Sequence, residues 1–148
     1  METARAPRVL IVDDTPRNAE LLEAYLADED YDLRVAADGE QALKQVEEWQ
    51  PDLMLLDIMM PKISGFEVCK RLKADPKTKH IAILMVTALD KPADVEKAVE
   101  AGTDDFLSKP IAKAALLHRV RSLLRVKQHQ GDLDRTLAYI EEMEKKGG

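Results

Sequence analysis

This 148-residue chain has little cysteine, no long apolar run and no leader-like segment. Its one cysteine, Cys69, excludes a disulfide bond within the chain and is typical of a reducing compartment. No stretch approaches the ~20 consecutive apolar residues of a membrane-spanning helix, and the first residues contain no apolar segment of the signal-peptide kind. We therefore expect a soluble, cytoplasmic protein with no membrane partner.

Excess positive charge and aromatic residues are also scarce. The chain has 22 Lys and Arg residues against 28 Asp and Glu residues, for a net charge of −6. This acidic balance argues against a general nucleic-acid surface, so we expect no nucleic-acid partner. Hydrophobic residues make up 45% of the chain and aromatic residues 4%, which indicates a core of Val, Ile, Leu and Ala. The length fits one domain with a short extension.

Short apolar strands alternate with helical segments five times along the chain. Periodicity and capping signals place helices at about 15–27, after Asp38 and up to Pro51, at 66–73, around Val95–Val99 and from Ala112. The expected strands are 8–12, 33–36, 53–56, 81–86 and 104–107. This alternation predicts an α/β fold with a doubly wound parallel sheet.

The strand at 53–56 ends on Asp57 and is followed by a loop with Pro61 and Gly65. Its four apolar residues have neither a helical nor an alternating period, which suits a strand buried on both faces. The other strands also end in polar groups. These are Asp13 and Asp14, Thr87, and Lys109. Because parallel strands end at one rim, where open α/β sheets bind ligands, we expect these groups to converge.

The residue types at this rim predict a phosphoryl-accepting site. Clustered carboxylates repel one another, and a hard divalent cation such as Mg²⁺ relieves that repulsion. Lys109 and Thr87 suit the oxygens of a phosphoryl group, and an Asp carboxylate such as Asp57 can act as the nucleophile.

Four separated motifs resemble the receiver domain of bacterial response regulators. They are Val-Asp-Asp at 12–14, Asp-Ile-Met-Met-Pro-Lys-Ile-Ser-Gly at 57–65, Val-Thr-Ala at 86–88 and Phe-Leu-Ser-Lys-Pro at 106–110. The match covers roughly residues 8–126. One departure is Ser64, where many receivers carry Asp, but this position lies outside the catalytic set.

The resemblance implies a flavodoxin-like sheet of order 2-1-3-4-5, also favoured by the switch-point rule. It implies a signalling module phosphorylated by a histidine kinase or phosphotransfer protein, which catalyses its own phosphorylation and dephosphorylation but is not a turnover enzyme. The implied roles are phosphoacceptor for Asp57, Mg²⁺ ligands for Asp13, Asp14, Asp57 and the Met59 backbone carbonyl, phosphoryl binding for Thr87 and Lys109, and aromatic switch for Phe106.

Taken singly, several of these residues have simpler explanations. Asp13 and Asp14 alone would more often be helix caps, and Phe106 is also a plausible core residue of a strand. In receivers, the positions of Met59 and Leu89 flank the path of the attacking water. Both residues are apolar here, so we expect slow self-dephosphorylation.

The last part of the chain extends beyond a minimal receiver. We expect a receiver domain over 1–125 and a helical tail or connector over 126–148. Leu133, Leu137 and Ile140 follow the 3/4 spacing of a short coiled-coil seam, which begins at Leu123, Val126 and Gln130. Gly131 weakens the helix, and Asp132 is an alternative start for a separate one.

This seam suggests a homodimer formed through the fourth helix, fifth strand, last helix and tail. Acidic residues of that surface would pair with Arg119 and Arg121 across a two-fold axis. The acidic set is Asp94, Glu96, Asp104 and Asp105. The alternative is that the whole basic run is a solvated face that pairs with no partner. This run consists of Lys113, Arg119, Arg121, Arg125 and Lys127.

Two other functions use related folds or chemistry. A phosphatase of the haloacid-dehalogenase type would carry a second Asp two residues after the nucleophile, where this chain has Met59. A flavodoxin-like cofactor binder would need a Ser/Thr/Gly-rich phosphate loop after the first strand, where Asp13 and Asp14 would repel phosphate. The sequence also leaves two alternatives for the downstream output of the domain. The chain is either a stand-alone regulator that binds a partner or the receiver of a cyclic-dinucleotide enzyme.

Overall fold

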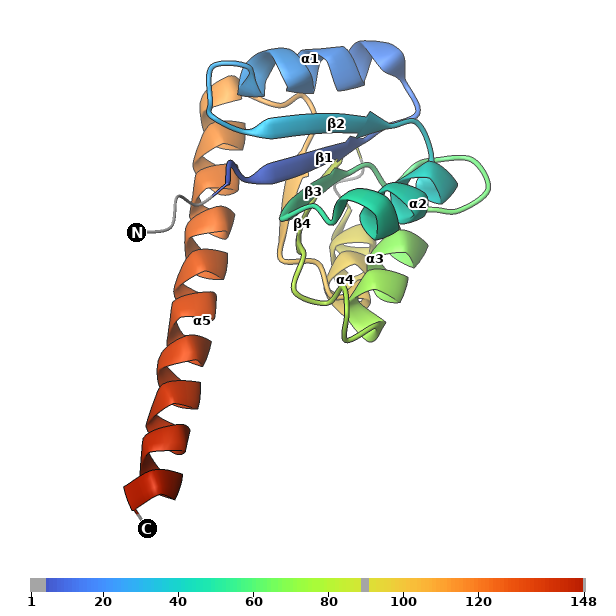
Figure 1. Cartoon of the computed structure of the whole chain (residues 1–148). Helices are drawn as coiled ribbons and strands as arrows, with labels where there is room; N and C mark the ends of the chain where they lie inside the picture. Colours follow the sequence, from blue (N-terminus) through green and yellow to red (C-terminus); the bar gives the residue numbers. More distant parts are fainter. Residues whose placement is uncertain (1–4, 89–90, 148) are drawn as a thin grey trace.

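A five-stranded parallel sheet forms the centre of the protein (Figure 1). The computed structural model describes residues 5–88 and 91–147, with only the backbone described at 128–132, 134–135, 138, 142 and 145–147. The strands are β1 Arg8–Val12, β2 Asp32–Ala36, β3 Leu53–Leu56, β4 Ala82–Thr87 and β5 Asp105–Ser108. Their order is β2-β1-β3-β4-β5 and each neighbouring pair is parallel, which confirms the predicted fold.

Helices cover both faces of the sheet (Figure 1). They are α1 Pro16–Leu26, α2 Gly39–Trp49, α3 Gly65–Ala74, α4 Pro92–Ala101 and α5 Lys113–Gly147. One core layer lies under α2, α3 and α4, and the other lies under α1 and the first half of α5. Successive strand residues point to opposite layers. Leu10 and Leu56 therefore pack in the first layer, while Ile11 and Leu55 pack in the second.

Local signals explain several helix boundaries. The Asp38 carboxylate accepts a hydrogen bond from Gln41 N at 2.8 Å, and the Gln41 side chain accepts one from Ala37 N at 2.9 Å. Gly102 ends α4 in the left-handed region, at φ 91°. Thr15 precedes α1, but its side chain makes no capping bond. Most of the predicted bounds are confirmed, but the starts of β2, β4 and β5 and the ends of β4 and β5 each differ by one residue from the prediction.

Helix α4 is packed less deeply than its apolar residues suggest. Of the three residues that predict it, only Ala98 is buried, whereas Val95 and Val99 are 39% and 68% exposed. The buried contacts of α4 come from the small residues Ala98 and Ala101. This helix therefore presents apolar side chains to solvent beside β5.

Helix α5 runs without a break from Lys113 to Gly147, so the alternative of a new helix at Asp132 is wrong. Its second half extends well beyond the sheet and the other helices (Figure 1). Leu133, Leu137 and Ile140 are 52%, 50% and 46% exposed. No helix among the described residues is long and apolar enough to cross a membrane.

The loop between β3 and α3 folds back tightly because Gly65 has no side chain. A Cβ at this position would lie 2.3 Å from Asp57 O and 2.8 Å from Ile58 Cα. Gly65 N also donates to Ile58 O at 2.9 Å. The backbone of this loop is therefore held directly against the end of β3.

Replacing Gly65 with alanine should lower the free energy of unfolding by about 2 kcal/mol, because the added methyl group meets rigid backbone. Urea denaturation of the whole chain measures this loss. Gly39→Ala is the milder comparison, since its Cβ would meet Ile63 Cβ and Val68 Cγ2 at 3.0 Å and backbone Ile63 O only at 3.2 Å. A loss at Gly39 equal to that at Gly65 would contradict this account.

Candidate functional site

The backbone of the sheet brings carboxylates from two strands to one edge. Asp57 N donates to Val12 O at 3.0 Å, which continues the β1–β3 pairing past the end of both strands. Asp13 N donates to Ala36 O at 3.2 Å in the same way. Asp13 and Asp57 are therefore fixed at the carboxyl edge of the sheet, as the sequence predicts.

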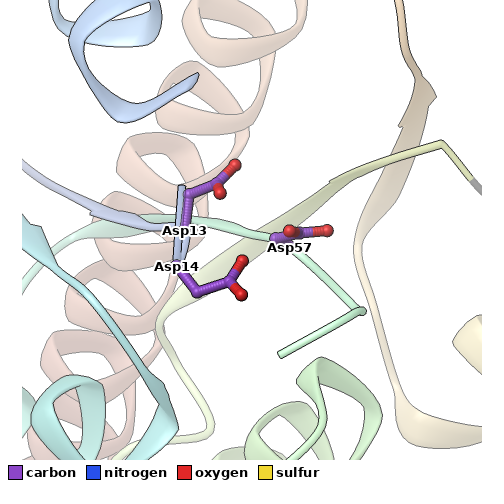
Figure 2. A group of neighbouring side chains, drawn as sticks. All are labelled: Asp13, Asp14 and Asp57. Carbon is purple, nitrogen blue, oxygen red and sulfur yellow. The ribbon is translucent and has the colours of Figure 1, made fainter. Parts of the chain in front are cut away.

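Asp13, Asp14 and Asp57 gather in one place (Figure 2). One carboxylate oxygen from each lies within 4.8 Å of the others. Asp13 and Asp57 are buried, at 3% and 7% exposure, and Asp14 is exposed. The cluster therefore has a closed base and an open side from which a ligand can enter.

Lys109 reaches the same cluster from the segment after β5. Its Nζ lies 3.2 Å from Asp13 Oδ2 and 3.9 Å from Asp57 Oδ2. Lys109 N donates to Thr87 O at 2.7 Å, which fixes this segment to the end of β4, and the Lys109–Pro110 bond is cis. Thr87 is fully buried. The structure thus brings Lys109 to the acidic cluster and links it to Thr87 through the backbone.

The environment of Asp57 disfavours its negative charge. Burial raises the pKa of its carboxyl group most, and Asp13 and Asp14 raise it further. Lys109 and the N–H of Met59, which lies 3.4 Å from Asp57 Oδ1, act in the opposite direction but do not cancel the increase. The site therefore holds more negative charge than its own protein partners neutralise.

The donor set of the cluster fits a hard divalent cation. Its three carboxylates offer only oxygen ligands, the type that Mg²⁺ and Ca²⁺ take, and two of them are held rigidly by strand ends. A cation bound there would supply positive charge beside the oxygens of Asp57. The Met59 carbonyl remains a predicted fourth ligand.

The roles of Met59, Leu89 and Phe106 stay predictions. The Met59 side chain is 64% exposed at the mouth of the site, and Leu89, the other residue of the predicted water path, lies outside the described residues. Phe106 is half-buried and packs against the core layer under α2, α3 and α4. Its position is compatible with both a core role and a switch role.

A shallow groove beside the site was not predicted from the sequence. It measures about 540 Å³ and lies between the loop after β3 and the start of α4. Met59, Met60 and Phe66 provide its apolar lining, and Asp94 and Lys97 line it from α4. The groove results from the packing of α3 against α4, and local sequence patterns do not predict that packing.

Without divalent cations at pH 7, Asp57→Asn should raise the free energy of unfolding by about 1 kcal/mol, because one buried like charge is removed. A carboxyl group whose pKa is raised in the fold favours folding at low pH, and this contribution is lost as the pH rises through the folded pKa. The difference between the two proteins should therefore disappear in acid. Urea unfolding at several pH values measures it.

Millimolar Mg²⁺ should then stabilise the parent protein more than Asp57→Asn, since the variant has lost one ligand. Asp38→Asn is the control, because Asp38 is a half-buried helix cap outside the acidic cluster and Asn caps equally well. A variant at Asp57 that is less stable than the parent in the absence of Mg²⁺ would contradict the charge argument.

Comparison with known proteins gives one consistent family. The family model of the response regulator receiver domain matches residues 9–121. The response regulator PleD of Caulobacter vibrioides is 48% identical over 120 residues, which are 81% of this chain and 26% of PleD. The transcriptional regulator RpaA of Synechocystis is 43% identical over 119 residues, 80% of this chain and 49% of RpaA. The chain therefore spans only about a quarter to a half of these relatives.

Solved structures agree with the sequence comparison. A CheY-like response regulator receiver domain protein from Methanospirillum hungatei superposes with a TM-score of 0.79 at 25% identity, covering 84% of this chain and 98% of that one. The receiver domain of a histidine kinase from Syntrophus aciditrophicus gives 0.77 at 34% identity, covering 81% and 91%. By sequence and by fold, this chain belongs to the response regulator receiver domain family of two-component systems.

Proposed function

We propose that this receiver is a phosphorylation-controlled switch whose phosphoacceptor is Asp57. The observation that carries the proposal is the buried Asp57 carboxylate beside Asp13, Asp14 and Lys109. The donor is the phosphohistidine of a histidine kinase or phosphotransfer protein. We place this reaction in the cytoplasm, in agreement with the single buried Cys69.

In the proposed reaction, an Asp57 carboxylate oxygen forms a bond to phosphorus as the bond from phosphorus to the donor imidazole nitrogen breaks. The nitrogen keeps the electron pair and takes up a proton. Lys109, 3.9 Å from Asp57 Oδ2, and Thr87 then bind the phosphoryl oxygens. The domain accepts a phosphoryl group and loses it by its own hydrolysis, so it is a switch and not a turnover enzyme.

The proposed cofactor is Mg²⁺, held by Asp13, Asp14, Asp57 and the Met59 carbonyl. When bound, Mg²⁺ offsets the negative charge that the phosphoryl group brings into the acidic cluster. The raised pKa of Asp57 supports a cation requirement, because an anion would otherwise enter a site that already repels negative charge.

We further propose that Thr87 and Phe106 transmit the change to the surface formed by α4, β5 and α5. Phe106 is half-buried on β5, opposite Met85 in the β4–β5 register, and has α4 on the same side of the sheet. Movement of Thr87 toward the phosphoryl group would make room for Phe106. Since α4 buries only small residues, a change of its packing is less costly than a change in the deep core.

The tail, residues 126–148, is the proposed output element of a receiver over 1–125. Arg119 and Leu137 lie five turns apart at about 3.6 residues per turn, so they share one face of α5. Arg119 bonds to Asp105 of β5, at 2.9 Å. A two-fold axis at the α4–β5–α5 surface would therefore place the seams of two tails side by side.

The ion pairs of this surface differ from those expected across a dimer. Arg119 pairs with Asp105 and Arg121 pairs with Glu29 in the same chain. Asp104 is held by Lys73 at 2.8 Å. The proposed dimer is therefore stabilised mainly by apolar groups, namely Val95 and Val99 of α4 and the exposed seam of the tail.

A haloacid-dehalogenase-type phosphatase remains the alternative chemistry, but the exposed Met59 side chain stands where that class needs a carboxylic acid. For the output, a connector to a cyclic-dinucleotide enzyme and a stand-alone partner-binding regulator are both compatible with the tail. The exposed seam favours the connector, because a helix extending from the domain can join another element.

Incubation with acetyl phosphate and Mg²⁺ should add one phosphoryl group to the chain, and Asp57→Asn should abolish the addition. Intact-mass spectrometry measures the labelled fraction, with an EDTA-treated sample expected to stay unlabelled. Asp38→Asn, at a half-buried helix cap outside the acidic cluster, should label like the parent. Equal labelling of Asp57→Asn would overturn the assignment.

Beryllofluoride, a mimic of the phosphoryl group, should shift the chain from monomer toward dimer in sedimentation experiments. Leu137→Lys should weaken that dimer at least tenfold and leave phosphorylation unchanged, because a charge enters the seam. Tyr139→Lys is the matched control, as Tyr139 is exposed but lies about 200° around the helix from Leu137. The dimer proposal fails if the oligomeric state is the same with and without beryllofluoride.

A further inference from the structure

Asp52 lies immediately before β3, at the opposite end of the strand from Asp57. Its backbone is fixed to both neighbouring strands, because Asp52 N donates to Arg8 O at 2.8 Å and Asp52 O accepts from Ala82 N at 3.1 Å. The Asp52 carboxylate therefore projects from a rigid point at the base of the sheet.

Three groups donate to this carboxylate. Arg8 N lies 2.8 Å from Oδ2, and the Arg5 guanidinium makes a bidentate contact at 2.8 and 3.3 Å. Lys127 Nζ from α5 lies 3.2 Å from Oδ1 and also 3.3 Å from Asp52 O. Burial alone would raise the pKa of Asp52, but these donors outweigh burial and hold the pKa below its usual value.

Lys127 lies where α5 changes from a helix packed on the receiver to an exposed helix. Leu123 and Leu124 still pack against the core layer under α1 and α5, whereas Val126 is mostly exposed. The Lys127 side chain is only 24% exposed because it lies along the base of the sheet. Further on, Leu133 and Leu137 face solvent. Lys127 thus bonds to the receiver one turn after the apolar packing and before the extended tail.

We propose that the contact of Lys127 with Asp52 sets the direction in which the tail leaves the receiver. Lys127 is in this view a positioning residue for output, and this use of the contact rests on the proposed function of the tail. The contact is present in the unphosphorylated chain. Because Arg5 and Arg8 N still bond to Asp52 when Lys127 is replaced, loss of Lys127 leaves the base of the sheet intact.

The competing explanation is that the apolar packing of Leu123 and Leu124 fixes the tail by itself. Lys127→Met separates the two explanations, since methionine keeps an unbranched apolar stem and nearly the same helix propensity but removes the ammonium group. Lys113→Met is the matched control. Lys113 is on the same helix, 14 residues before Lys127, and pairs with exposed Asp28 at 3.7 Å.

The test measures the distance between spin labels on Glu48→Cys and Tyr139→Cys by pulsed electron resonance, in the full unphosphorylated chain diluted with unlabelled protein. Both labelled positions are exposed. Cys69 does not compete for the label, since it is buried and burial raises the pKa of its thiol to about 11. The parent should give one narrow distance distribution.

Lys127→Met should shift that distribution or broaden it at least twofold, and Lys113→Met should leave it unchanged. Amide hydrogen exchange just after Leu124 should also become about three- to tenfold faster in Lys127→Met, the range expected for loss of a partly buried charged contact. A Lys127→Met distribution and exchange rates like those of the parent would overturn the proposal and assign the tail direction to apolar packing.

Two further readouts keep this test separate from the proposed function. The thermal unfolding of Lys127→Met should stay cooperative, which shows that the receiver is folded when the tail is loose. Acetyl phosphate should label Lys127→Met like the parent, since Asp57 lies at the other end of β3. Failure of labelling in the parent would overturn the proposed function and leave the positioning contact untouched.

Discussion

Repulsion among carboxylates at one edge of the sheet is the constraint on which the rest of the site depends. The parallel pairing of β1 with β3 forces Asp13 and Asp57 together, and burial removes much of the water that would screen them. Burial raises the pKa of Asp57 most, Asp13 and Asp14 raise it further, and Lys109 offsets only part of the increase. An arrangement that costs stability is retained at functional sites when its ligands relieve the cost. In the proposed function, a divalent cation would relieve this cost and allow the site to admit an anion.

The surrounding packing holds this unfavourable cluster in place. All residues of β3 are buried, and the loop after Asp57 cannot relax away because the backbone at Gly65 lies against Asp57 and Ile58. The strand also begins at a fixed point, where Asp52 bonds to the strands on either side. The charges are therefore confined by neutral, closely packed elements that give them no freedom to separate.

Most of the fold, and the members of the site, could be predicted from the sequence because both rest on local signals. The apolar run before Asp57 has no helical period, the Asp38 cap marks a helix start, and polar residues at strand ends must meet if the strands are parallel. Pairings that depend on tertiary geometry could not be predicted. Arg121 bonds to Glu29 from 92 positions away, and Lys127 bonds to Asp52 from 75 positions away. No pattern in either segment selects its partner.

How deeply each helix packs against the sheet likewise could not be predicted from the sequence. Val95 and Val99 have helical spacing, but the size of Ala98 and Ala101 sets how closely α4 approaches the sheet. The valines then flank the contact and remain exposed. The burial of the Phe106 side chain could not be predicted for the same reason, because its half-buried position depends on how α4 and β5 pack together.

The two ends of β3 suggest how a change at Asp57 would reach the tail. Asp52 and Asp57 are about 16 Å apart at roughly 3.3 Å per residue, but β3 is buried on both faces, so a change in its packing would disturb both core layers. We therefore place the path of the signal outside the strand itself. The elements with room to repack are Phe106 and the shallowly packed α4, at the outer edge of the sheet. In this arrangement the contact of Lys127 with Asp52 acts as the fixed reference. Under the proposed positioning role, it would hold the tail to the buried centre, so that a change of the α4–β5–α5 surface would alter which tails meet and not where each tail points.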